Sequence, residues 1–318
     1  KVMLEVKDLK VSFFTDLGET QAVKDAGFAI EEGDFFGIVG ESGSGKSVTT
    51  KSILRLGPSN CRIMGGEILF QGEDILKKSE AELREIRGGE IAMIFQDSLS
   101  ALNPVYTVGN KMVELIRRHT SMTKKEAKAR VLELLTAVGI TDPEKAMRSY
   151  PHELSGGMRQ RVMIAMAMSS NPKVLIADEP TTALDVTIQA QILHLLLELQ
   201  KKNNMSIILI THDLGVVAQT CKRVAVMCGG YVVEEGTVEE IFLNPGHPYT
   251  QALIASMPRV GGTFEQFLER DLSDGSGNLC PFLNRCKYAD KTCEACLPKY
   301  YESSEEHKIL CHRREEEK

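Results

Sequence analysis

The chain has 318 residues and a formal net charge of −6, and 42% of its residues are hydrophobic and 26% charged. This composition is that of a globular protein, and the length suffices for one large domain with an appendage or for two medium ones. The acidic balance argues against bulk nucleic-acid binding, which needs a basic surface. No apolar run approaches the roughly 18 residues of a membrane span. The charged start, Lys1–Glu5, predicts a strand and not a signal peptide. We therefore expect a cytoplasmic protein with reduced thiols.

Strands and helices alternate along most of the chain. Apolar runs predict strands at 2–11, 26–30, 35–39, 65–70, 91–95, 173–178, 206–211, 224–227 and 231–234, and helices at 48–56, 79–87, 158–169, 187–202, 214–220 and 249–256. Residues 107–149 are charged, poor in strand signals and helical in period, so they predict an inserted helical segment. The alternation indicates an α/β fold with a parallel sheet.

The stretch 40–47 (GESGSGKS) lies between a predicted buried strand and a predicted helix. In that context the pattern G-x-x-x-x-G-K-[ST] predicts a phosphate-binding loop, and a glycine-rich turn that matches by chance is the alternative. Gly43 and Gly45 allow backbone N–H groups to converge on phosphate oxygens, and the N-terminus of the next helix adds its dipole. Lys46 is expected to reach the β- and γ-phosphates, and the Ser47 hydroxyl to bind Mg²⁺.

A later apolar strand, at 174–177, ends in two carboxylates. Asp178 is suited to bind Mg²⁺ directly or through water, and Glu179 to orient or deprotonate a water that attacks the γ-phosphorus. Taken alone, the pattern is equally typical of a solvated strand end. It is not alone, because the stretch 154–160 (LSGGMRQ) precedes it and 180–185 (PTTALD) follows it.

The stretch 154–160 has the features of a second anion-binding site, one that contains no lysine. Ser155 is a favourable N-cap, and Gly156 and Gly157 expose the first N–H groups of the following helix. A simple cap between two helices is the alternative for this stretch on its own.

With these motifs in this order, residues 2 to about 258 resemble the ATP-binding subunit of an ATP-binding-cassette (ABC) transporter. The resemblance implies an α/β fold: a P-loop NTPase (RecA-like) core with a parallel sheet, an antiparallel β subdomain, an inserted helical subdomain and a small cysteine-rich C-terminal domain. The expected boundaries are 1–95 with 171–245 for the core, 96–170 for the helical insertion, and 246–318 for the C-terminal extension.

The resemblance also implies roles for single residues. Glu179, His212 and Gln96 are expected to be catalytic, with His212 as the switch histidine and Gln96 coupling to the membrane partner. The expected Mg²⁺ ligands are Ser47, Gln96 and Asp178. Phe13 matches the aromatic residue that stacks on adenine, and Phe14 is its rival. The full set of expected nucleotide-binding residues is Phe13, Gly40, Ser42, Gly43, Ser44, Gly45, Lys46, Ser47, Val48, Asp178, Ser155, Gly156, Gly157 and Asp185.

Three stretches narrow the resemblance. Residues 96–104 (QDSLSALNP), 177–191 and 247–250 (HPYT) are similar to the dipeptide/oligopeptide importers, a group that includes nickel importers. In that group two ATPase chains sandwich two ATP molecules beneath two membrane permeases, and an extracytoplasmic solute-binding protein supplies the solute. We expect a peripheral protein at the cytoplasmic face of the membrane that drives peptide uptake. Import of nickel or another solute, a soluble ABC ATPase of DNA repair or translation, and a degenerate non-enzymatic member are the alternatives.

Five of the eight cysteines lie between Cys280 and Cys311. By resemblance, Cys280, Cys286, Cys293 and Cys311 are expected to hold a [4Fe–4S] cluster. Zn²⁺ is the alternative, because the short spacing from Cys293 to Cys296 favours zinc, and reduced thiols without metal are a third possibility. The tail is poor in apolar residues, so a bound group is expected to be structural.

Overall fold

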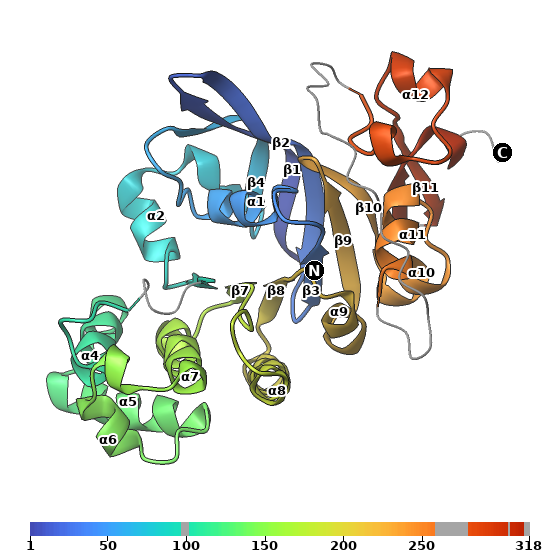
Figure 1. Cartoon of the computed structure of the whole chain (residues 1–318). Coiled ribbons are helices and arrows are strands. Elements are labelled where there is room, and N and C mark those ends of the chain that lie inside the picture. The colour runs from blue at the N-terminus through green and yellow to red at the C-terminus, as the bar shows by residue number, and fades with distance from the viewer. Residues whose placement is uncertain (97–101, 258–278, 305, 315–318) are drawn as a thin grey trace. The chain divides into compact units, whose positions relative to one another are not determined.

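The computed structural model of the chain describes residues 1–96, 102–257, 279–304 and 306–314 (Figure 1). It contains two compact units. One consists of Lys1–Ile30, Phe35–Leu76 and Thr211–Lys318, and the other of Glu31–Asp34 and Lys77–Ile210. The predicted linker at 261–278 and part of the stretch 96–104 lie outside the described residues.

The first unit is built on a mixed sheet with the strand order β5-β4-β1-β2-β10-β9-β3, in which β12 also pairs with β10 (Figure 1). β1 is antiparallel to β4 and β9 to β10, whereas β3 is parallel to β9. Its elements are β1 (Val2–Thr15), β2 (Gly18–Glu31), β3 (Phe35–Val39), α1 (Lys46–Ile53), β4 (Cys61–Phe70), β5 (Glu73–Asp74), α9 (Leu214–Thr220), β9 (Arg223–Cys228), β10 (Tyr231–Thr237), α10 (Val238–Leu243), α11 (Pro248–Ala255), α12 (Lys291–Ala295), β11 (Tyr300–Ser304) and β12 (His307–Leu310).

The predicted strand at 35–39 is confirmed, and all five residues of β3 are buried. The predicted strand at 26–30 is too short, because β2 already begins at Gly18. Residues 18–21 are exposed. This first part of β2 has no buried apolar residues and so gives no hydrophobic alternation that could predict it.

The C-terminal hairpin of β11 and β12 was not predicted. β12 pairs with β10, where Ile309 lies opposite Glu234. The Glu234 carboxylate is fully buried and accepts hydrogen bonds from the backbone N–H groups of Gly246 (2.6 Å) and His247 (2.9 Å), and His307 Nε2 lies 2.7 Å from it. A buried carboxylate needs such partners, and they fix the strand to the sheet through polar contacts that an apolar pattern does not reveal.

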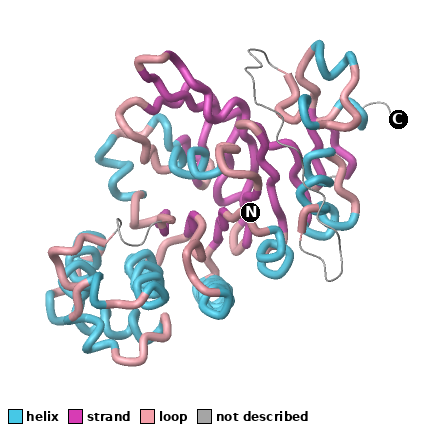
Figure 2. Tube along the Cα trace, in the orientation of Figure 1, coloured by secondary structure: helices cyan, strands magenta, loops and turns pink. Residues whose placement is uncertain are grey.

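The second unit combines three parallel strands, in the order β8-β7-β6, with a helical segment (Figures 1 and 2). β7 and β8 are wholly buried, as strands covered on both faces are. The predicted helical character of 107–149 is confirmed. The elements are α2 (Glu80–Ile86), β6 (Ile91–Ile94), α4 (Val108–His119), α5 (Lys124–Ala137), α6 (Pro143–Arg148), α7 (Gly156–Ala167), β7 (Val174–Asp178), α8 (Val186–Asn203) and β8 (Ser206–Ile210).

Within the described ranges, none of the helices combines the length and the apolar character needed to cross a membrane.

Candidate functional site

The phosphate loop, Gly40–Ser47, connects β3 to α1 in the first unit. Gly43 and Gly45 have φ angles of +78° and +102°, which side chains other than glycine rarely adopt. A Cβ on Gly45 would also lie only 2.8 Å from the carbonyl oxygen of Ala22. The helix begins at Lys46, two residues earlier than predicted, so the unbonded N–H groups of its first turn follow the loop directly.

The Lys46 side chain lies across this loop. Its Nζ donates hydrogen bonds to the carbonyl oxygens of Gly40 and Glu41, both at 2.8 Å, and the residue is 5% exposed. The Ser44 hydroxyl is buried and has no hydrogen-bond partner among the described residues. A buried cation, a free hydroxyl and glycine-permitted turns together fit an anion such as a phosphate.

In the second unit, β7 ends at the buried Asp178, and Glu179 follows with a left-handed φ of +46°. The Glu179 carboxylate accepts hydrogen bonds from Gln96 Nε2 (2.8 Å) and Thr182 Oγ1 (3.0 Å). Strained backbone of this kind is concentrated at functional sites. The structure thus brings two of the three expected catalytic side chains, Gln96 and Glu179, into contact.

The stretch 154–160 in the same unit forms the start of α7. The Ser155 hydroxyl accepts a hydrogen bond from the Met158 N–H (3.3 Å), which confirms the predicted N-cap. A Cβ on Gly157 would lie 3.0 Å from Cγ2 of Ile188, in the first turn of α8, whose N-cap is Asp185. The glycine therefore permits the starts of α7 and α8 to pack closely.

The other expected nucleotide-binding residues lie in the first unit. His212 is exposed just before α9, whose N-cap is Asp213. Phe13 and Phe14 are both half-buried in β1, and the Arg62 guanidinium lies over the Phe14 ring, 5.2 Å from its centroid. The assignment of Phe13 or Phe14 to stacking on a base stays a prediction.

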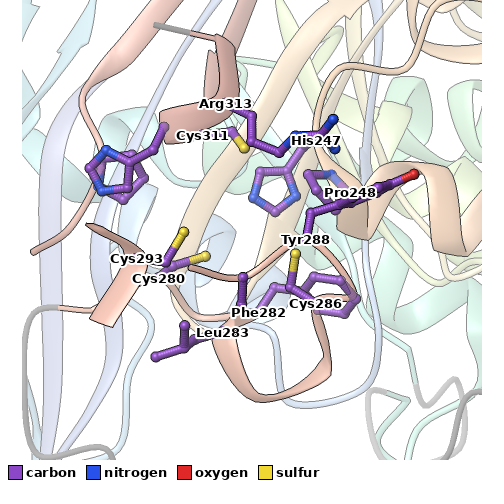
Figure 3. Close-up of a pocket in the computed structure, with 13 residues that line it drawn as sticks. His247, Pro248, Cys280, Phe282, Leu283, Cys286, Tyr288, Cys293, Cys311 and Arg313 are labelled. Carbon is purple, nitrogen blue, oxygen red and sulfur yellow. The ribbon is translucent and has the colours of Figure 1, made fainter. Parts of the chain in front are cut away.

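The four predicted cysteine ligands line one pocket in the first unit (Figure 3). Burial, with a smaller contribution from the three neighbouring cysteines of the pocket, raises the pKa of the Cys280 thiol to about 11. Cys296 is exposed and is not among the lining residues. The pocket residues are His247, Pro248, Cys280, Phe282, Leu283, Cys286, Tyr288, Ala289, Cys293, Pro298, Cys311, His312 and Arg313.

His247 contributes a buried donor to this pocket. Its Nδ1 accepts a hydrogen bond from the Tyr249 N–H (3.0 Å), and burial lowers its pKa to about 4, so the ring is neutral with the proton on Nε2. In the described part of the chain Nε2 has no hydrogen-bond partner, and Figure 3 shows the ring among the cysteine sulfurs. The pocket therefore offers an N–H group together with four sulfur atoms.

Sequence reasoning missed two residues that contact the phosphate loop, Tyr249 and Arg285. The Tyr249 hydroxyl accepts a hydrogen bond from the Glu41 N–H, and Arg285 pairs with the Glu41 carboxylate. The sequence gives Tyr249 significance only as part of the HPYT stretch. Arg285 lies 244 residues from its partner, so no local pattern could indicate the contact.

Comparison with known proteins identifies the family. The model of the ABC transporter family matches residues 23–182. The chain belongs to the ABC transporter family. A second model, the C-terminal region of oligopeptide/dipeptide transporters, matches residues 233–293 and places this ABC protein in the dipeptide/oligopeptide group. Both levels of the predicted resemblance are confirmed.

Relatives and solved structures of ABC proteins agree with this result. The chain is 56% identical over 267 residues to the oligopeptide transport ATP-binding protein OppD of Bacillus subtilis (strain 168), covering 84% of the chain and 75% of the relative. It is 48% identical over 316 residues to the dipeptide transport ATP-binding protein DppD of the same strain, covering 97% and 94%. The dimeric post-hydrolysis structure of the ATP-binding cassette MJ0796 with ADP and Pi has a TM-score of 0.67 and 29% identity, covering 74% and 99%. The fold is therefore that of a P-loop ABC ATPase.

Proposed function

We propose that this ABC ATPase powers the import of dipeptides or oligopeptides through a separate membrane channel. The observation that carries the proposal is the match to a dipeptide transport ATP-binding protein over 97% of the chain, together with the C-terminal match to peptide transporters. A peripheral position at the cytoplasmic face of the membrane follows from that role.

The nucleotide chemistry is divided among the residues described above. Lys46 and the N–H groups of the phosphate loop would bind the phosphates of ATP, and Ser47, Gln96 and Asp178 would each offer an oxygen ligand to Mg²⁺. Glu179 accepts the proton of the attacking water, and its hydrogen bond from Gln96 fixes the carboxylate that does so. His212 contacts the γ-phosphate. Ser155, Gly156 and Gly157, with the N-terminus of α7, serve the ATP of the facing subunit.

The partners of the working transporter are a second, related ATPase chain and two permeases, with a solute-binding protein acting outside the membrane. Within this chain we propose the division into a core (1–95 and 171–245), a helical insertion (96–170) and a C-terminal extension (246–318). Nickel remains the alternative solute, because the expected group contains nickel importers.

We propose that Cys280, Cys286, Cys293 and Cys311 hold a [4Fe–4S] cluster, with a single zinc ion as the alternative. The four sulfurs line one pocket, and the buried Nε2–H of His247 is a suitable donor to a sulfur atom of such a cluster. Among the described residues, no group of three or more His, Cys, Asp or Glu side chains is placed to hold a single metal ion.

The cluster proposal predicts different results for two cysteines. Replacing Cys286 by serine removes one of the four lining sulfurs, so most of the iron and the brown visible absorption should be lost from anaerobically purified protein. Cys296→Ser is the matched control, because Cys296 is exposed and does not line the pocket, and it should keep both. Colourless wild-type protein with stoichiometric zinc would contradict the proposal.

The import proposal is tested by comparing two solutes in one strain. Cells that carry the Glu179→Gln chain in place of the wild type should lose uptake of a radiolabelled tripeptide and keep uptake of radioactive nickel. Normal peptide uptake accompanied by loss of nickel uptake would contradict the assignment of the solute.

A further inference from the structure

The C-terminal cysteine segment pairs with the phosphate loop through Arg285. This residue ends the short helix Leu283–Arg285, between Cys280 and Cys286. Its two terminal nitrogens donate to the two carboxylate oxygens of Glu41, at 2.6 and 2.7 Å. The Arg285 side chain is 17% exposed and that of Glu41 45%. Two parallel hydrogen bonds of this kind fix the relative orientation of the two side chains and also pair their charges.

A second contact comes from the HPYT stretch. The Tyr249 hydroxyl accepts the Glu41 N–H at 2.9 Å, and its ring meets Phe282 edge-on at 5.4 Å. The Arg285 guanidinium lies over the same Phe282 ring, 5.3 Å from its centroid. Phe282 is 2% exposed and also lines the cysteine pocket. Glu41 is thus held through both its backbone and its side chain by residues next to that pocket.

Glu41 is the single carboxylate of the loop sequence GESGSGKS. A negative charge in a loop that binds a polyanion is unfavourable unless a cation neutralises it. The Lys46 ammonium donates a hydrogen bond to the carbonyl oxygen of Glu41. The position of Glu41 therefore also affects the position of this ammonium group.

We propose that Arg285 is a positioning residue for ATP binding, which neutralises Glu41 and holds the start of the phosphate loop in its binding conformation. The inference rests on the proposed role of this loop as the triphosphate site. It gives the C-terminal segment a part in nucleotide binding in addition to holding a metal group.

Equilibrium titration of the full chain with a fluorescent ATP analogue tests the proposal. Arg285→Ala should raise the Kd about fivefold, since it leaves the Glu41 carboxylate unpaired. Adding Glu41→Gln to that variant should return the Kd to within about twofold of wild type, because no charge then needs neutralising. An unchanged Kd for Arg285→Ala, or no recovery in the double variant, would overturn the proposal.

Lys287→Ala is the matched control. Lys287 is an exposed cation two residues away, and its ammonium lies over the Tyr288 ring. Its loss should leave the Kd unchanged. An equal effect of both substitutions would mean that general charge and not the pair with Glu41 is responsible, and the proposal would be wrong. If thermal melting shows that Arg285→Ala does not fold, Arg285→Lys, which keeps the charge without the paired bonds, should raise the Kd in the same direction.

The same titration separates this inference from the proposed nucleotide site. Loss of binding in Lys46→Ala with no change in Arg285→Ala would refute the positioning role alone. Wild-type binding by Lys46→Ala would refute the site itself, and the positioning role with it.

Discussion

Glu179→Gln is expected to lower ATP turnover by about a hundredfold to ten-thousandfold, the usual contribution of a general base, while ATP binding is retained. The glutamine side chain has the same shape and can still accept the hydrogen bonds that Gln96 and Thr182 donate. An amide cannot take up the proton of the attacking water, so only the chemical step is lost. Phosphate release by the assembled transporter measures turnover, and titration with labelled ATP measures binding.

Glu198→Gln provides the control for this substitution. Glu198 is an exposed carboxylate on α8 that pairs with His194, and its loss should leave turnover unchanged. Hydrolysis at the wild-type rate by Glu179→Gln would refute the assignment of the base. Loss of both binding and turnover would instead show that Glu179 supports the fold of the site.

Lys46→Ala is expected to weaken ATP binding by about a hundredfold or more, because charge-assisted hydrogen bonds to phosphate are among the strongest that the loop can make. In the structure this ammonium is buried against the carbonyl oxygens of Gly40 and Glu41. Its removal takes away the positive charge of the loop and leaves these acceptors without their donor.

Lys51→Ala, in the last turn of the same helix, tests whether any lysine of α1 would have this effect. We expect its Kd for ATP to equal that of the wild type. Similar losses in the two variants would mean that Lys46 has no special role in the phosphate loop.

Local patterns predicted the parts of the site that are contiguous in the sequence. The phosphate loop needs a buried strand, two glycines in left-handed conformations and a helix start, and all of these lie within about twenty neighbouring residues. The cap of α7 by Ser155 is local in the same way. The set of four cysteines came instead from the resemblance to the importer group, and the structure places their sulfurs in one pocket. That they hold a metal group stays a prediction.

Contacts between distant or polar segments could not be predicted. Gln96 and Glu179 are 83 residues apart, and only the pairing of β6 with β7 brings them together. β12 adds to the sheet through the buried carboxylate of Glu234, which no hydrophobic pattern reveals. The pairing of Arg285 with Glu41 depends on the same placement of the C-terminal segment.

The most direct test is an experimental structure of the Glu179→Gln protein with Mg²⁺ and ATP. The β- and γ-phosphates should lie within hydrogen-bonding distance of Lys46 Nζ and of the backbone N–H groups from Gly43 to Ser47. The account would be contradicted by a triphosphate that is bound elsewhere while those N–H groups and Lys46 contact only protein atoms.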